Sequence, residues 1–108
     1  MRLHDTFEWD PMKARSNLRK HGVSFDDAAA VLADDDGDRF HVDEYDDRNS
    51  MAEDRWITTG SHPAERSIVL RIAWTERIDG ADRITRIITA RAASPRERRP
   101  YVEAITSA

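Results

Sequence analysis

Residues 83–101 read Arg-Ile-Thr-Arg-Ile-Ile-Thr-Ala-Arg-Ala-Ala-Ser-Pro-Arg-Glu-Arg-Arg-Pro-Tyr, and the rest of the chain is organised around them. The first half is rich in isoleucine and threonine, which pack well on a pleated surface and therefore predict a strand. The second half predicts a helix, with Ser94 as the cap, Pro95 in the first turn and Glu97 completing a capping box. Five of the six arginines lie within fourteen residues, which is typical either of a solvated surface or of a phosphate-binding edge: Arg86, Arg91, Arg96, Arg98 and Arg99.

The segments upstream predict the other strands of an antiparallel sheet. Residues 67–75 alternate most regularly, with one apolar and one mixed face, so we expect them to form the central strand. The dipeptide Asp79-Gly80 predicts a hairpin that returns into residues 83–91. Residues 55–62 predict a third strand and residues 39–47 a weaker one. By simple alternation, three polar residues share one side of the last strand: Thr85, Thr89 and Arg91.

The N-terminal part predicts a short edge strand followed by two helices. Residues 7–10 contain the strand, and Asp10 with Pro11 then opens the first helix, which ends at Gly22. Ser24 is expected to cap the second helix. The apolar set of the first helix is small: Met12, Ala14 and Leu18.

This order of elements predicts an α+β fold in one domain over residues 1–108. We expect an antiparallel sheet of about four strands, with two N-terminal helices and one C-terminal helix packed on it. The chain has no cysteine, which excludes disulfides and thiolate metal sites. It also has no apolar run long enough to span a membrane, and we expect a cytoplasmic protein that binds no membrane.

Charge is distributed unevenly along the chain. Residues 1–25 carry a net charge of +2, residues 26–54 a net charge of −10, and residues 55–108 a net charge of +4. The two ends would attract an anionic ligand, whereas the acidic middle is either a solvated surface or a docking place for a basic partner. The acidic residues 34–38 lack the ligand spacing of a calcium loop, so we predict no metal site there.

Six short motifs follow one another along the chain with a consistent spacing. Each is weak alone, but together they cover most of the chain and resemble the BrnT family of type II toxin–antitoxin toxins. They are Phe7-Glu8-Trp9-Asp10-Pro11 with Asn17, Lys20-His21-Gly22-Val23-Ser24-Phe25, Glu53-Asp54-Arg55, Trp74-Thr75-Glu76-Arg77, Arg86-Ile87-Ile88-Thr89-Ala90-Arg91, and Glu97-Arg98 with Tyr101.

The resemblance carries expectations about fold, activity and partners. It implies a RelE-like fold with the helices against one face of the sheet. It implies a ribonuclease that uses no metal or other cofactor and arrests growth by blocking translation. It also implies a BrnA-like antitoxin, a ribbon-helix-helix protein that binds DNA, so that the toxin meets DNA only through the complex that represses its own operon.

Metal-free RNA cleavage needs a base for the 2′-hydroxyl, cations for the crowded phosphate and an acid for the leaving 5′-oxygen. Arginine suits the second task because its planar fork binds two phosphate oxygens and stays charged. Arg55, Arg77 and Arg91 are the first candidates, because they lie at strand ends and in the motifs, and Arg86 follows. The alternative is that each arginine belongs to a minor surface ion pair.

The base and the acid are harder to assign from the sequence. His21 suits either task, because histidine exchanges protons near neutral pH, and Glu53 is either the base or a residue that orients Arg55. Lys20 is a further candidate for the site, and both Lys20 and His21 also suit the C-terminal turn of a helix. Tyr101 is expected to stack on an RNA base, whereas Trp74 fits the core better.

A second function fits the same residues. In that alternative the chain is a non-catalytic module that binds an antitoxin-like partner and tunes repression at DNA, and the arginines contact phosphates or the partner without cleaving. Pro100 adds a structural question, because a proline inside the last helix removes a backbone donor and crowds the preceding turn. That helix is therefore expected to be short, kinked, or restarted at Pro100.

Overall fold

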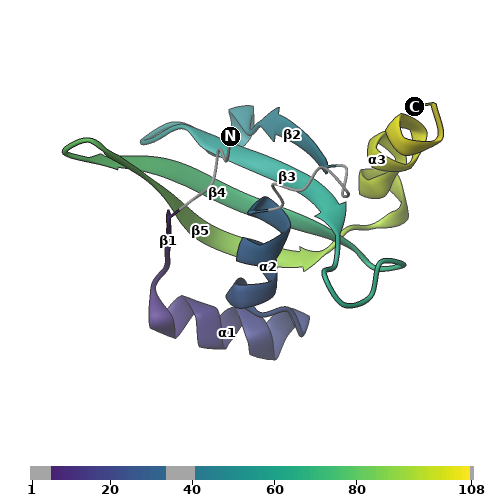
Figure 1. Cartoon of the computed structure of the whole chain (residues 1–108), viewed down its shortest axis with the longest axis horizontal. Helices are drawn as coiled ribbons and strands as arrows, with labels where there is room; N and C mark the ends of the chain where they lie inside the picture. The colour runs from purple at the N-terminus through teal and green to yellow at the C-terminus, as the bar shows by residue number, and fades with distance from the viewer. Residues whose placement is uncertain (1–5, 34–40, 108) are drawn as a thin grey trace.

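The computed structural model describes residues 6–33 and 41–107, which form a five-stranded sheet and three α-helices (Figure 1). The acidic residues 34–38 lie outside the described residues. The elements in chain order are β1 (Thr6–Glu8), α1 (Pro11–His21), α2 (Phe25–Leu32), β2 (His41–Tyr45), the 3-10 turn η1 (Asp47–Asn49), β3 (Arg55–Ser61), β4 (Val69–Asp79), β5 (Asp82–Ala92) and α3 (Pro95–Ser107).

The strands lie in the order β1-β5-β4-β3-β2, so β4 is central, as its alternation predicts. The four strands β2 to β5 pair antiparallel, and β1 adds a fifth strand that runs parallel to β5. The sheet therefore has five strands rather than about four. Gly80 adopts a left-handed φ of 63° in the turn between β4 and β5, which confirms the predicted hairpin.

A β-bulge in β5 changes which side chains share a face of the sheet. Ala73 pairs with Thr89 but Trp74 pairs with Ile87, so Ile88 is an extra residue without a partner on β4. Arg86 and Arg91 consequently face the same way although they are five residues apart. The simple alternation was therefore wrong for Thr85, which lies opposite Glu76 and faces away from Thr89.

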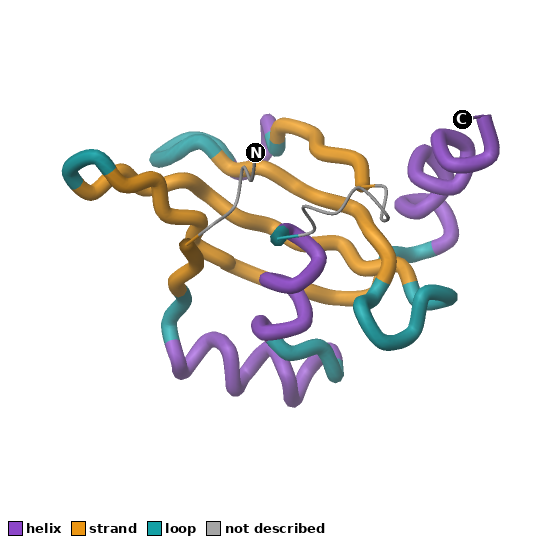
Figure 2. The backbone as a smooth tube through the Cα atoms, in the orientation of Figure 1, coloured by secondary structure: helices purple, strands orange, loops and turns teal. Residues whose placement is uncertain are grey.

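Helices α1 and α2 cover one face of the sheet, and the tube in Figure 2 shows both on the same side of the strands. The core beneath them includes Phe25 and Val31 from α2 and Leu70, Ile72 and Trp74 from β4, all buried. Trp74 is a core residue, and its Nε1 donates a hydrogen bond to Thr58 Oγ1 at 2.8 Å. The opposite, open face carries no helix along most of its length (Figure 1).

Helix α1 packs through the polar residue Asn17 and, of its expected apolar set, through Ala14 alone. Met12 and Leu18 are exposed, whereas Asn17 is buried against the edge of β5. The Asn17 side chain accepts a hydrogen bond from Ala90 N at 3.1 Å and donates one to Ala90 O at 2.7 Å. Strand β1 pairs with β5 only as far as Arg86. Beyond that point the Asn17 side chain satisfies the backbone hydrogen-bonding groups of β5 at Ala90.

Helix α3 begins with the predicted capping box and continues through Pro100. Glu97 N donates to Ser94 Oγ, and Glu97 Oε1 accepts from Ser94 N. The helix runs unbroken to Ser107, so Pro100 neither ends nor restarts it. It contacts β2 and β3 at the end of the sheet opposite the hairpin (Figure 1) and does not share the face of α1 and α2.

Candidate functional site

The open face of the sheet holds a hollow of about 370 Å³ that is lined mainly by arginines. Its floor comes from β3, β4 and β5, and its rim from η1 and the residues around it. Four arginines and the carboxylate of Asp46 line it, and Glu44 and Glu97 bind two of these arginines. The lining residues are Asp46, Arg48, Asn49, Arg55, Ile57, Arg71, Ala73, Ile88, Thr89 and Arg91.

Two of these arginines are held by one glutamate from α3. Arg91 donates from Nη1 and Nη2 to the two carboxylate oxygens of Glu97, both at 2.7 Å, and Arg71 Nε lies 3.2 Å from Glu97 Oε2. Arg71 also donates to Glu44 at 3.2 Å. The hydrogen bond from Arg91 is the main reason that the pKa of Glu97 falls to about 2. Glu97 is therefore a fixed anion that orients the two arginines and a poor proton acceptor.

Arg55 is paired less closely than Arg71 and Arg91. Its Nε is buried and makes no hydrogen bond to any residue that the structure describes. Its nearest carboxylate is that of Glu53, with 3.8 Å between Nη2 and Oε1, and Glu53 is half exposed. A buried guanidinium N–H without an acceptor is costly, and a movement of the side chain that let it donate to an anion in the hollow would remove this cost.

Arg77 and Arg86 belong to a separate cluster on the same face. Both bind Glu8 of β1: Arg77 donates from Nη2 at 2.7 Å and Arg86 from Nη1 at 2.8 Å. Arg77 lies six residues from Arg71 along β4, which at ~3.3 Å per residue is about 20 Å. One scissile phosphate therefore cannot meet both Arg77 and Arg91, and the cluster ties β1 to the sheet.

This cluster leads to a prediction about acid stability. The hydrogen bond from Arg77 is the largest cause that lowers the pKa of Glu8 from 4.5 to about 2. A lowered folded-state pKa stabilises the fold fully above about pH 4.5, and that contribution is lost as the pH falls towards 2. We expect Glu8→Gln to lower the free energy of unfolding by about 1 kcal/mol at pH 7, with the difference from the wild type shrinking below pH 4.5.

Urea unfolding at several pH values measures this difference. Glu103→Gln is the matched control, because Glu103 is exposed and its carboxylate has no ion-pair partner among the described residues. A Glu8→Gln deficit that stays constant from pH 7 to pH 2.5 would show that the Arg77 and Arg86 contacts do not stabilise the folded state.

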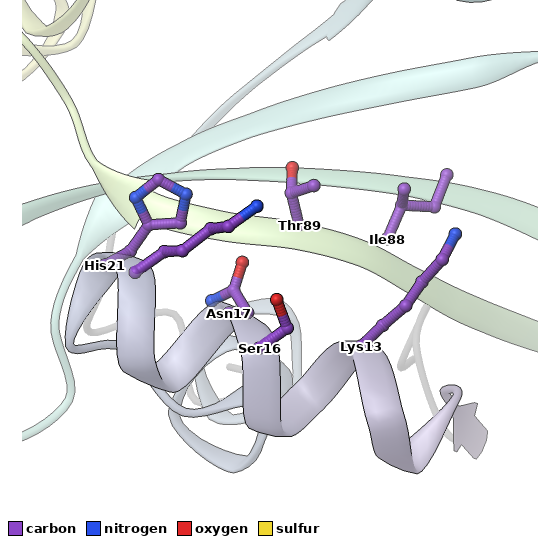
Figure 3. Close-up of a pocket in the computed structure, with 7 residues that line it drawn as sticks. Lys13, Ser16, Asn17, His21, Ile88 and Thr89 are labelled. Atoms are coloured by element: carbon purple, nitrogen blue, oxygen red, sulfur yellow. The ribbon is translucent and has the colours of Figure 1, made fainter.

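Lys20 and His21 lie in a second, smaller groove on the other side of the β5 edge. This groove, of about 180 Å³, runs between α1 and β5 (Figure 3). Ile88 and Thr89 line both the groove and the hollow, so the two spaces adjoin at the bulge of β5. Tyr101 lies elsewhere and is buried, with 7% of its surface exposed. Its ring packs within the fold, which leaves stacking on an RNA base dependent on a movement of α3.

The structure thus divides the residues that the sequence singled out. Arg55 and Arg91 meet in the hollow with Glu53 beside them, Arg77 and Arg86 bind Glu8, and Lys20 and His21 line the groove. The sequence reasoning missed Arg48 and Arg71 as parts of the hollow. Arg71 was visible as a polar residue on the mixed face of the central strand, but its neighbours depend on strand register. Arg48 lies in the turn η1, for which no sequence pattern predicted a position.

A small α+β fold with an arginine-lined hollow on its open sheet face is suited to binding phosphate groups. The model of a protein family matches residues 9–97, and its description is the ribonuclease toxin BrnT of type II toxin–antitoxin systems. The chain therefore belongs to the BrnT family, and the family implies an antitoxin partner and an RNA target. No curated protein matches the chain.

The described residues contain neither a metal-binding group of side chains nor a membrane-spanning helix. In residues 6–33 and 41–107, no three histidine, aspartate or glutamate side chains are grouped so that they could hold a metal ion. None of the helices that the structure describes is both long and apolar enough to cross a membrane.

Proposed function

We propose that the hollow on the open face is the site where this toxin binds RNA and cleaves it without a metal ion. The observation that supports this most directly is the convergence of Arg48, Arg55, Arg71 and Arg91 on one cavity. The buried Nε of Arg55 has no acceptor among the described residues, and a phosphate oxygen would supply one. Family membership provides the ribonuclease activity, and the hollow provides a place for it.

The three arginines on the floor of the hollow would share one task. Arg55, Arg71 and Arg91 surround the place of the phosphate and stabilise the extra negative charge that develops as the 2′-oxygen attacks phosphorus. Arg71 and Arg91 are already oriented by Glu97, so little reorganisation is needed when the substrate binds. Glu97 keeps these side chains in place and acts as a positioning residue.

Proton transfer is assigned to groups beside the hollow. Glu53, which lies next to Arg55, is placed to accept the proton of the 2′-hydroxyl. His21 lines the α1–β5 groove with Lys20 and Thr89, and we assign it the protonation of the leaving 5′-oxygen. The pH dependence of cleavage by Glu53→Gln and His21→Asn separates these roles, because each change removes one limb of the wild-type curve.

A cognate antitoxin completes the proposal. We assign the partner to the BrnA-like class of ribbon-helix-helix proteins, through which alone the toxin would meet operator DNA, and we place both proteins in the cytoplasm with the RNA. The alternative of a non-catalytic binding module has one observation in its favour. Glu97 already neutralises part of the charge on Arg71 and Arg91, as in an ion-pair network that serves only structure.

Induced expression of the chain alone distinguishes the two functions. We expect growth to stop within a few generations and total RNA to show new cuts that end in 2′,3′-cyclic phosphates, the product of attack by the 2′-oxygen. Purified toxin incubated with RNA in the presence of a chelator should give the same ends, because no step uses a metal ion. Normal growth with intact RNA would support the binding module, and cleavage that stops in chelator would contradict the metal-free mechanism.

A further inference from the structure

The groove between α1 and β5 has a composition that the cleavage chemistry alone does not explain. Its walls carry three side chains that are cationic or can become so, Lys13, Lys20 and His21, together with the hydroxyl groups of Ser16 and Thr89. Lys13 lies two helical turns from Lys20, which is more than a single proton transfer needs. The part of the chain that the structure describes offers these three side chains no ion-pair partner.

The edge of β5 is open to the groove because of two local features. Strand β1 pairs only with residues 84–86, so no strand covers the edge beyond Arg86. Asn17 satisfies the backbone of Ala90, and the bulge at Ile88 turns the chain just before Thr89. Figure 3 shows Lys13, Ser16 and Asn17 rising from α1 towards β5, with Ile88 and Thr89 opposite them. The groove and the hollow therefore adjoin at Ile88 and Thr89, which line both.

We propose that this α1–β5 groove is a second phosphate subsite, which holds a backbone phosphate of the RNA segment that flanks the cleavage point. The RNA strand would lie in the hollow, cross the β5 edge at Thr89 and continue along α1 over Lys20 and Lys13. The inference rests on the proposed function, because it extends the same RNA path. Lysines on a helix contact phosphates as point charges, so this subsite adds affinity without reading the base sequence.

The test compares RNA binding by two double variants of α1. Lys13→Gln/Lys20→Gln removes two positive charges from the groove. Arg15→Gln/Arg19→Gln is the matched control, because it removes two charges from the same helix at positions that do not line the groove. The probes are a 2′-O-methyl RNA decamer, which lacks the attacking hydroxyl, and a 2′-O-methyl dinucleotide, which fills only the hollow.

We expect the groove variant to bind the decamer roughly tenfold more weakly at low salt. The slope of log affinity against log salt should become shallower by about 1.4, since each phosphate contact to a single strand contributes about 0.7. Dinucleotide affinity should fall much less than decamer affinity, and the control variant should resemble the wild type with both probes. Circular dichroism and the thermal midpoint confirm that both variants are folded.

Each contrary result is distinguishable. A decamer affinity and salt slope equal to those of the wild type would overturn the subsite, and so would an equal loss in the control variant. A groove variant that loses affinity for the antitoxin but not for the decamer would assign the groove to the protein partner instead. Failure of the proposed function looks different: the wild type would then not bind the decamer, or Arg55→Ala would bind it as well as the wild type.

Discussion

Replacing Arg55 with alanine is expected to lower the rate of RNA cleavage ~10²-fold or more and to abolish growth arrest. Removal of a single donor aimed at a developing charge typically costs a factor of this size. The fold should hardly change, with a loss of only ~0.5 kcal/mol, because the one ion pair of the Arg55 side chain within residues 6–33 and 41–107 is the long one to Glu53, at 3.8 Å. Single-turnover cleavage of a short RNA, measured with saturating enzyme, reports the chemical step directly.

Two further substitutions sharpen this prediction. Arg55→Lys keeps the charge but lacks the planar fork, so we expect it to recover only a small part of the rate. Arg77→Ala removes an arginine of the same face that binds Glu8 and does not line the hollow, and it should leave the rate within a few-fold of the wild type. Equal rate losses at Arg55 and Arg77 would contradict a site confined to the hollow. The effect of Arg91→Ala is harder to interpret, because this change also removes the main hydrogen-bond partner of Glu97.

The local features of the fold were predictable from the sequence because they depend on neighbours along the chain. Asp10 caps α1, Gly22 ends it with a φ of 68°, and Ser24 caps α2, all as predicted. The alternation of β4 likewise identified the central strand. Each of these signals acts over a few residues, where capping and side-chain period leave few alternatives.

The site was less predictable because it depends on register between strands. Nothing in the sequence marks Ile88 as a bulge, yet this one residue places Arg86 and Arg91 on the same face. Which arginines line the hollow and which bind Glu8 depends on carboxylates from distant segments, since Glu8 is 69 residues from Arg77. Composition identified the right residue type, but only the fold shows that Arg55 and Arg91 share a cavity and that Arg77 does not.

The antitoxin is expected to bind this toxin tightly, with an association rate that falls roughly tenfold or more from low to high salt. Complementary charge mainly accelerates association, and exposed charges are screened over about 8–10 Å at ordinary ionic strength. The toxin presents the arginine-lined hollow next to the carboxylates of Glu44, Asp46 and Glu53. A partner with charges of both signs therefore fits this surface.

Affinity and inhibition should then depend on different contacts. Apolar anchors set the lifetime of a complex, and Met51, with 96% of its surface exposed, is the clearest anchor beside the hollow. We expect Met51→Ala to raise the dissociation rate several-fold with little change in association, and Arg55→Ala to slow association chiefly at low salt. Stopped-flow binding of the antitoxin at two salt concentrations, with RNA cleavage followed in parallel, measures both steps. An association rate indifferent to salt would rule out charge guidance. A saturated complex that still cleaves RNA would show that the antitoxin leaves the hollow uncovered and inhibits from elsewhere.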